Sequence, residues 1–126
     1  MSIIVQKYGG TSIGTIEKIS SVAEKIIKEK NNGNKVVVVV SAMSGETNKL
    51  LDLAKSIDPD VSGRELDVLV STGEQVTISL LALTLNNKGH KAISLTGSQA
   101  GITTDSAFNK ARIESIDNTS IKKYLE

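Results

Sequence analysis

The stretch VQKYGGTSIG, residues 5–14, runs from an apolar, β-branched segment into a loop with three glycines. The segment before the loop, SIIVQKY at 2–8, predicts a strand. After the loop, apolar residues recur every three or four positions, which predicts a helix with one apolar stripe (Ile16, Ile19, Val22, Ala23, Ile26 and Ile27). KVVVVV at 35–40 has the unbroken apolar pattern of a strand covered on both faces. Strand, helix and buried strand predict a βαβ unit, and so an α/β fold with a parallel sheet.

Shorter signals mark the boundaries of these elements. Glu24 and Lys28 are spaced to form an ion pair on the wet side of the first helix, and NNGN at 31–34 should end it. Further helices are expected at 47–57, at 64–70 and at 74–89, the last of them buried and ended by Gly89. The sequence predicts a third strand at 90–95, short extended pieces and loops at 96–113, and one or two helical turns near the end.

Composition narrows the class of protein. The chain has 126 residues, a formal net charge of +1 and only 2% aromatic residues, which argues against nucleic acid as a partner. Cysteine is absent, which excludes disulfides and thiolate metal sites and suits a cytoplasmic protein. We found neither a signal peptide nor an apolar run of roughly 20 residues, so no membrane contact is expected.

The opening loop has the parts of a phosphate site, although it fits neither common phosphate motif. Gly9 and Gly14 have the spacing of a Walker loop, but Thr15 stands where the lysine belongs, and G-x-G-x-x-G is absent. Gly9 and Gly10 allow close approach of the backbone to an anion, and Lys7 lies at the carboxyl end of a strand, where open α/β sheets bind ligands. On the glycine pair alone, a tight strand-to-helix turn with an exposed lysine is the simpler interpretation.

The wider motif set changes that interpretation. KYGGTSIG resembles the opening signature of the aspartokinases, a branch of the amino acid kinase family. VVVVVSAMSGETNKL, LVSTGEQVTISLLALTLNNKGHKA and SLTGSQAGITTDSAFNKARI continue the resemblance, in that family's order and spacing, over almost the whole chain. The resemblance implies a parallel-sheet αβα sandwich of the amino acid kinase type. It also implies that residues 1–126 form only the N-terminal portion of the catalytic domain. The nucleotide-binding part and the regulatory ACT domains would then lie outside these residues.

The implied reaction is transfer of the γ-phosphoryl group of ATP, bound with Mg²⁺, to the side-chain carboxylate of L-aspartate. Because the substrate is the nucleophile, catalysis would consist of positioning and charge neutralisation. The resemblance assigns Lys7 to the phosphoryl oxygens as the catalytic residue, and Lys7, Tyr8, Gly9 and Gly10 to ATP binding. It further implies a role in lysine, threonine and methionine biosynthesis, and we expect a homo-oligomer.

Three residues are candidates for the aspartate site. Ser41 and Thr47 flank the turn after the second strand, where the resemblance has them bind aspartate. Equally, Ser41 could simply end a strand and Thr47 cap the next helix. Glu74 follows Ser71 by three residues, as in a capping box at a helix start. The resemblance places Glu74 on the α-amino group of aspartate instead, and one carboxylate could do some of both.

Other residues receive no role. Asp105 and the hydroxyls of 96–112 cannot be assigned individually, and a surface or packing role is expected for His90. No cluster of acidic residues or histidines has metal-ligand spacing, so magnesium is expected to arrive with ATP. The alternative to an enzyme segment is a truncated, non-catalytic module that binds small anions or pairs with another chain.

Overall fold

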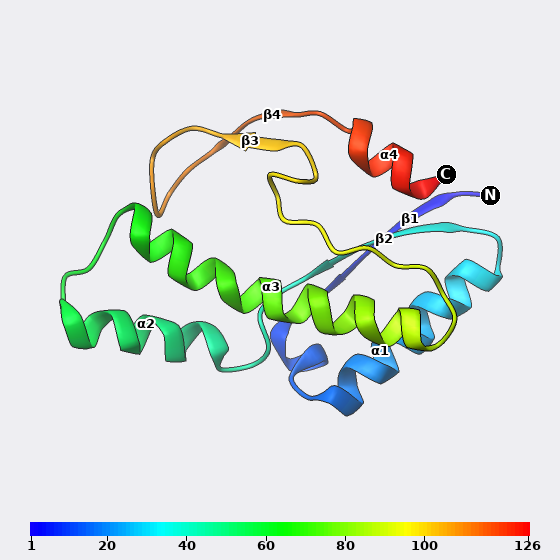
Figure 1. Cartoon of the computed structure of the whole chain (residues 1–126), viewed down its shortest axis with the longest axis horizontal. Helices are drawn as coiled ribbons and strands as arrows, with labels where there is room; N and C mark the ends of the chain where they lie inside the picture. Colours follow the sequence, from blue (N-terminus) through cyan, green and yellow to red (C-terminus); the bar gives the residue numbers. More distant parts are fainter.

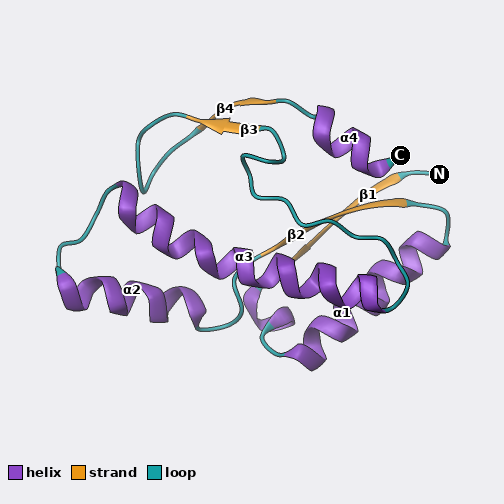
Figure 2. Ribbon diagram, viewed as in Figure 1, coloured by secondary structure: helices purple, strands orange, loops and turns teal.

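The computed structural model describes all residues 1–126, which form a small parallel sheet, three long helices and a separate hairpin (Figure 1). Figure 2 shows that α1, α2 and α3 lie on one side of the chain and the hairpin and α4 on the other. The elements are β1 (Ile3–Tyr8), the 3₁₀ turn η1 (Gly10–Ile13), α1 (Ile16–Asn31), β2 (Lys35–Val40), α2 (Glu46–Ile57), α3 (Arg64–Asn87), β3 (Ile102–Thr104), β4 (Ile113–Ile116) and α4 (Thr119–Leu125).

The βαβ unit predicted from the first forty residues is confirmed. β1 and β2 pair in parallel, with Ile4 opposite Val36 and Tyr8 opposite Val40. On α1, four residues of the apolar stripe are buried, Ile27 is half-buried and Ile16 is exposed. The stripe packs with two leucines of α3 and with the even-numbered valines of β2. Helices α1 and α3 therefore cover the same face of the sheet.

The other face of the sheet is open, contrary to the prediction from KVVVVV. Ile3 is 59% exposed, Val5 65% and Val39 48%, and all three lie on the odd-numbered face. Within residues 1–126 only one helical layer packs on β1 and β2, so one face of the valine run remains in solvent. Only 11 of the 126 residues are buried, which is a small core for a chain of this length.

The helices predicted at 64–70 and 74–89 are one continuous helix, α3, so the prediction of a helix start at Ser71 is wrong. Its buried residues Gly73, Thr77, Leu81 and Leu85 form a single stripe. Leu81 and Leu85 pack with α1, and Gly73 lies against Ala42 and Leu50 of α2. Only this stripe is buried, so the helix is one-sided rather than buried all round. By length and composition alone α3 could cross a bilayer, but this stripe packs in the core of the chain.

The segment 90–95 is not a strand, contrary to the prediction. It runs alongside the end of α3, and the Asn86 side chain makes two hydrogen bonds with its backbone, at Ala92. The amide oxygen of Asn86 accepts a bond from the Ala92 N–H at 2.8 Å, and its amide nitrogen donates to the Ala92 carbonyl at 3.2 Å. No strand pairs with this segment; Ala92 packs against the core, whereas Ile93 is 52% exposed.

Two predicted helix ends are confirmed, and one ion pair is not. Gly33 and Gly89 follow α1 and α3 in the left-handed region, with φ of 87° and 84°. Glu24, however, pairs with Lys88 at 2.9 Å and not with Lys28, so this contact joins α1 to the end of α3.

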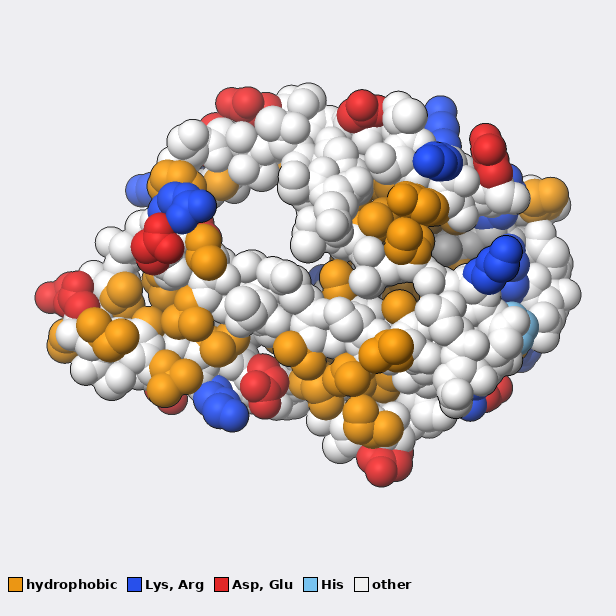
Figure 3. All heavy atoms as spheres, in the orientation of Figure 1, with side chains coloured by type: hydrophobic (Ala, Val, Ile, Leu, Met, Phe, Trp, Pro, Cys, Tyr) orange, Lys and Arg blue, Asp and Glu red, His pale blue; other side chains and the backbone are white.

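The hairpin β3–β4 lies in the region where short extended pieces were predicted. Figure 3 shows an opening between the hairpin and α3. The turn of the hairpin is fixed by Asn109. Its side-chain amide accepts a bond from the Gly63 N–H and donates one to the Gly63 carbonyl, and its backbone and side-chain N–H groups each donate to the Asp67 carboxylate. The bonds from the backbone and then the side chain of Asn109 hold the pKa of Asp67 below its usual range. The hairpin is thus docked on the start of α3.

We expect residues 1–126, expressed alone, to self-associate. The open sheet face and the unpaired strand edges offer both apolar surface and free backbone groups to a second copy. Light scattering coupled to size-exclusion chromatography should show a mass above the monomer that rises with concentration. Val5→Lys, which places a charge on the open face, should shift the chain toward monomer. Ser21→Lys, on exposed α1 surface, should not, and an equal shift in both variants would contradict this explanation.

Candidate active site

The candidate site lies at the carboxyl ends of β1 and β2, where two turns meet. The first is the glycine loop after β1, and the second is the Ser41–Gly45 turn, which leads from β2 into α2. The Ser41 N–H donates to the Tyr8 carbonyl at 3.2 Å, and the Ser44 N–H donates to the Gly10 carbonyl at 3.2 Å. These bonds hold the Ser41–Gly45 turn directly beside the glycine loop.

The glycine loop is short and braced. Gly9 is extended, and η1 follows it before Thr15 caps α1 by accepting a bond from the Lys18 N–H. The Lys18 ammonium donates to the Thr11 carbonyl at 2.9 Å, which ties the first turn of α1 back to the loop. The backbone N–H of Gly9 has no acceptor in the chain. A free backbone donor between Lys7 and a helix start is suited to an anion.

Glu74 reaches this site from the middle of α3. Its Oε1 accepts a bond from the Ala42 N–H at 3.3 Å, which brings a carboxylate to the Ser41–Gly45 turn. Because α3 begins at Arg64, Glu74 cannot form a capping box with Ser71. The Ser71 hydroxyl donates to the Val68 carbonyl instead, as expected inside a helix. The prediction that Glu74 lies at a helix N-terminus is therefore wrong. Glu74 lies inside α3 and contacts the Ser41–Gly45 turn.

Thr47 does not cap α2, since the helix begins at Glu46 after Gly45 and no side chain bonds its first turn. The N–H groups of Thr47 and Asn48 have no bond to the turn before them. The start of α2 thus adds open backbone donors just after the Ser41–Gly45 turn, and a carboxylate or phosphate is the usual acceptor for such groups.

Lys7 carries an uncompensated charge at the end of β1. The two ion pairs of the structure are Arg64–Glu65 and Lys88–Glu24, so the Lys7 ammonium is bound to no carboxylate. Strand alternation puts Lys7 on the open face of the sheet, together with Val5. This leaves the ammonium available to a ligand at the sheet edge.

Tyr8 lies on the opposite face from Lys7. Its ring packs against the core, and its hydroxyl donates to Gln6 at 2.9 Å. Burial, and secondarily the charge of Glu29, raises the pKa of the Tyr8 phenol above its usual value. The side chain is thus a packing group, and a role for Tyr8 in ATP binding stays a prediction.

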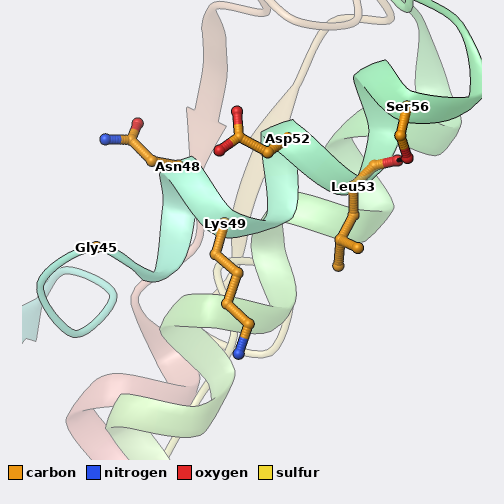
Figure 4. A pocket seen from close by; sticks show the side chains of 6 residues that line it. All are labelled: Gly45, Asn48, Lys49, Asp52, Leu53 and Ser56. Atoms are coloured by element: carbon orange, nitrogen blue, oxygen red, sulfur yellow. Dashed lines mark hydrogen bonds between the residues drawn. The ribbon is translucent and has the colours of Figure 1, made fainter.

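A depression of the surface begins at Gly45, the last residue of the Ser41–Gly45 turn. It follows one side of α2 and is lined by Gly45, Asn48, Lys49, Asp52, Leu53 and Ser56 (Figure 4). Neither Lys7, Ser41 nor Glu74 lines it, and a single apolar residue does. Chemistry therefore points to the meeting of the two turns and not to this depression.

Metal-binding side chains do not gather at the site. No three histidine, aspartate or glutamate side chains of the chain come together. Lys7 at the end of β1 and Glu74 beside the Ser41–Gly45 turn are charges of opposite sign, and neither belongs to an ion pair. Such a pair suits a phosphoryl group on one side and an amino group on the other.

Two residues of the site were missed from sequence. Ala42 supplies the N–H that holds Glu74, and Gly73 lies directly beneath Ala42 on α3. A glycine inside an apolar helical pattern is the signal that could have pointed to Gly73, because it usually has a packing reason. Ala42 gives no comparable signal, since alanine fits most environments.

Comparison with known proteins supports the motifs. The sequence is 58% identical over 125 residues to an aspartokinase of Bacillus sp. (strain MGA3), covering 99% of this chain and 30% of that protein. It is 57% identical over 126 residues to the aspartokinase of Geobacillus stearothermophilus, covering 100% of this chain and 31% of that one. The chain therefore spans about a third of the length of these relatives. The resemblance to aspartokinases over almost the whole chain is confirmed.

A solved structure agrees. The aspartate kinase from Synechocystis superposes with a TM-score of 0.74 at 53% identity, over 79% of this chain and 17% of that one. This confirms the predicted α/β fold class. The sequence profile of the amino acid kinase family matches residues 2–126. With its fold, its motifs and its profile in agreement, the chain belongs to the amino acid kinase family.

Proposed function

We propose that this chain is the N-terminal portion of the catalytic domain of an aspartate kinase. The observation that carries the proposal is the meeting of two motifs at one point. The glycine loop bonds the Ser41–Gly45 turn through Ser44, and Glu74 bonds the same turn through Ala42. A phosphate-binding loop and a carboxylate beside it are what phosphoryl transfer to an amino acid requires. Relatives of 50–59% identity that bear the name aspartokinase or aspartate kinase support this substrate.

In the proposed reaction the side-chain carboxylate of L-aspartate attacks the γ-phosphorus of ATP. The bond from the γ-phosphorus to the bridging oxygen breaks. The products are ADP and 4-phospho-L-aspartate. Lys7 neutralises charge on the transferred phosphoryl oxygens, and Gly9 and Gly10 bind the phosphates through their backbone N–H groups. These donors are fixed before reaction, so they lose no energy to reorganisation in the transition state.

On the substrate side, Glu74 binds the α-amino group, and Ser41 and Thr47 bind aspartate through hydroxyl and backbone donors. Magnesium accompanies ATP and is held by phosphates and water, because the chain offers it no cluster of carboxylates. The proposal extends to a homo-oligomeric cytoplasmic enzyme, without nucleic acid or membrane partners. The enzyme would start the pathway to lysine, threonine and methionine.

A second candidate is a non-catalytic module that binds small anions or pairs with another chain. The open, apolar sheet face favours it, because such a face can pair with another chain. The two candidates separate in an assay of the full-length protein that carries this segment. ADP release that depends on aspartate supports the kinase, and anion binding without turnover supports the module.

Glu74→Gln in the full-length protein tests the proposed site. Glutamine keeps the size of the side chain and can still accept the bond from the Ala42 N–H, so a structural role predicts little change. Loss of a charged partner for the substrate amino group predicts a rise in the Michaelis constant for aspartate of about 10- to 100-fold, corresponding to roughly 1.5–3 kcal/mol. The constant for ATP should change little, and initial-rate kinetics in each substrate measure both.

Glu65→Gln is the matched control, because Glu65 lies on the same helix and pairs only with Arg64 at the surface. It should leave both constants unchanged. If Glu74→Gln behaves like Glu65→Gln, then Glu74 only holds the turn and does not bind the substrate.

A further inference from the structure

Gly73 occupies an unfavourable place for a glycine. It lies well inside α3, where glycine is among the poorest helix formers, and it is buried. Its backbone is helical, so no left-handed conformation requires a glycine there. The reason for a glycine must therefore lie in what packs against it.

The Ser41–Gly45 turn is what packs against it. A Cβ atom built on Gly73 would lie 2.9 Å from the Cβ of Ala42, closer than real Cβ atoms approach, and 3.6 Å from Leu50 Cδ1. Ala42 is 5% exposed and cannot move outward without losing its packing. The missing side chain of Gly73 thus allows the turn to rest on the backbone of α3.

The opposite side of the same turn rests on the glycine loop. A Cβ on Gly10 would lie 2.9 Å from the Ala42 carbonyl oxygen, and one on Gly14 would lie 3.3 Å from Ser44 Cβ. The turn is therefore held between two glycine surfaces, one on the loop and one on α3. Neither surface can recede easily, because the loop is tied to Lys18 and α3 to the core.

We propose that Gly73 is a positioning residue that sets the distance between the glycine loop and the Glu74 carboxylate. Ala42 transmits that distance: its methyl touches Gly73, its N–H holds Glu74, and its carbonyl lies against Gly10. A methyl group at position 73 pushes the turn away from α3. This movement separates the Ala42 N–H from the carboxylate of Glu74, the residue that follows position 73. The inference deepens the proposed function and rests on it for the consequence at the substrate.

The test is a four-variant cycle in the full-length protein: wild type, Gly73→Ala, Ala42→Gly and the double variant. Gly73→Ala should raise the Michaelis constant for aspartate about tenfold, the consequence expected of overpacking by one methyl, with the constant for ATP within about threefold of wild type. The double variant lacks the Ala42 methyl group that would overlap with the new methyl group at position 73. Its Michaelis constant for aspartate should therefore return to within about threefold of the constant of Ala42→Gly. A mere loss of folded enzyme would lower kcat and leave the Michaelis constant unchanged.

Ser79→Ala is the control, since Ser79 is exposed on the same helix, and it should match wild type. The proposal is overturned if Gly73→Ala leaves the aspartate constant unchanged, or if Ala42→Gly fails to restore it. If Gly73→Ala does not fold, the double variant should fold, and failure of both overturns the contact.

The outcome remains separable from the proposed function. If the wild-type protein does not phosphorylate aspartate, the proposed function fails, and the melting temperatures of the same four forms still test the contact. Gly73→Ala should then melt below wild type, despite the better helix propensity of alanine, and Ala42→Gly should recover the loss. A melting temperature that rises in Gly73→Ala shows that no steric contact exists.

Discussion

Residues 1–126 alone are expected to release no measurable ADP in the presence of ATP, Mg²⁺ and aspartate. Lys7 lies on the sheet face that is open to solvent. On that side, no part of residues 1–126 packs over the site to enclose a ligand. Phosphoryl transfer requires donor, acceptor and charge clamp in near-attack geometry, which contributes about 7–11 kcal/mol. Relatives are about three times longer than this chain, and the remainder of their length is where we expect the nucleotide wall.

A coupled ADP-release assay measures this expectation, with the full-length protein as positive control. The fragment carrying Lys7→Ala gives the background from contaminating ATPases. Turnover above that background by a monodisperse monomer would show that residues 1–126 form a complete site, and would contradict the assignment to a partial domain.

The elements that could be predicted from sequence are those set by local periodicity. The apolar stripe of α1 predicts a helix, and the glycines after α1 and α3 predict where these helices end. Both signals depend only on residues that are close in sequence. The parallel pairing of β1 and β2 also followed, since one helix between two apolar runs leaves little other choice.

α3 shows how a local signal can mislead. Ser71 and Glu74 have capping-box spacing, and Gly73 interrupts the helical pattern, so the segment suggested a helix start. The structure continues the helix through Gly73. Half-buried Leu66, Leu69 and Val70 precede Gly73 in phase with the buried stripe that follows it, and Gly73 packs against Ala42. A tertiary contact outweighed the local propensity.

Strand predictions failed where they depended on distant partners. The apolar pattern of 90–95 is correct for a strand, but a strand exists only when a neighbouring strand pairs with it. Here the partners are the Asn86 side chain and, for the His90 N–H, the Leu85 carbonyl. The valine run of β2 likewise indicates two covered faces, while α1 and α3 cover one. Neither outcome is encoded within the segment itself.

Half of the candidate site could be placed in advance. Carboxyl ends of parallel strands meet at one edge, which brings Lys7, Gly10 and Ser41 together from sequence alone. The contact from Glu74 to Ala42 could not be predicted, because it depends on α3 passing under the Ser41–Gly45 turn. The roles of all these residues stay predictions until the variants are measured.

Lys7→Ala in the full-length protein should lower kcat by about 10²–10³, or roughly 3–4 kcal/mol, while the Michaelis constant for aspartate changes little. The expected reason is the role proposed for Lys7: its ammonium, which no carboxylate of the chain neutralises, would stabilise charge that develops on the phosphoryl oxygens in the transition state. Lys7→Arg keeps the charge but not its position, so it should recover only part of the rate. Lys25→Ala removes a charge from exposed α1 surface and is the matched control. Initial-rate kinetics at saturating ATP and aspartate distinguish these variants, and a Lys7→Ala rate within a few-fold of the Lys25→Ala rate would show that the charge at the end of β1 does not act on the transferred group.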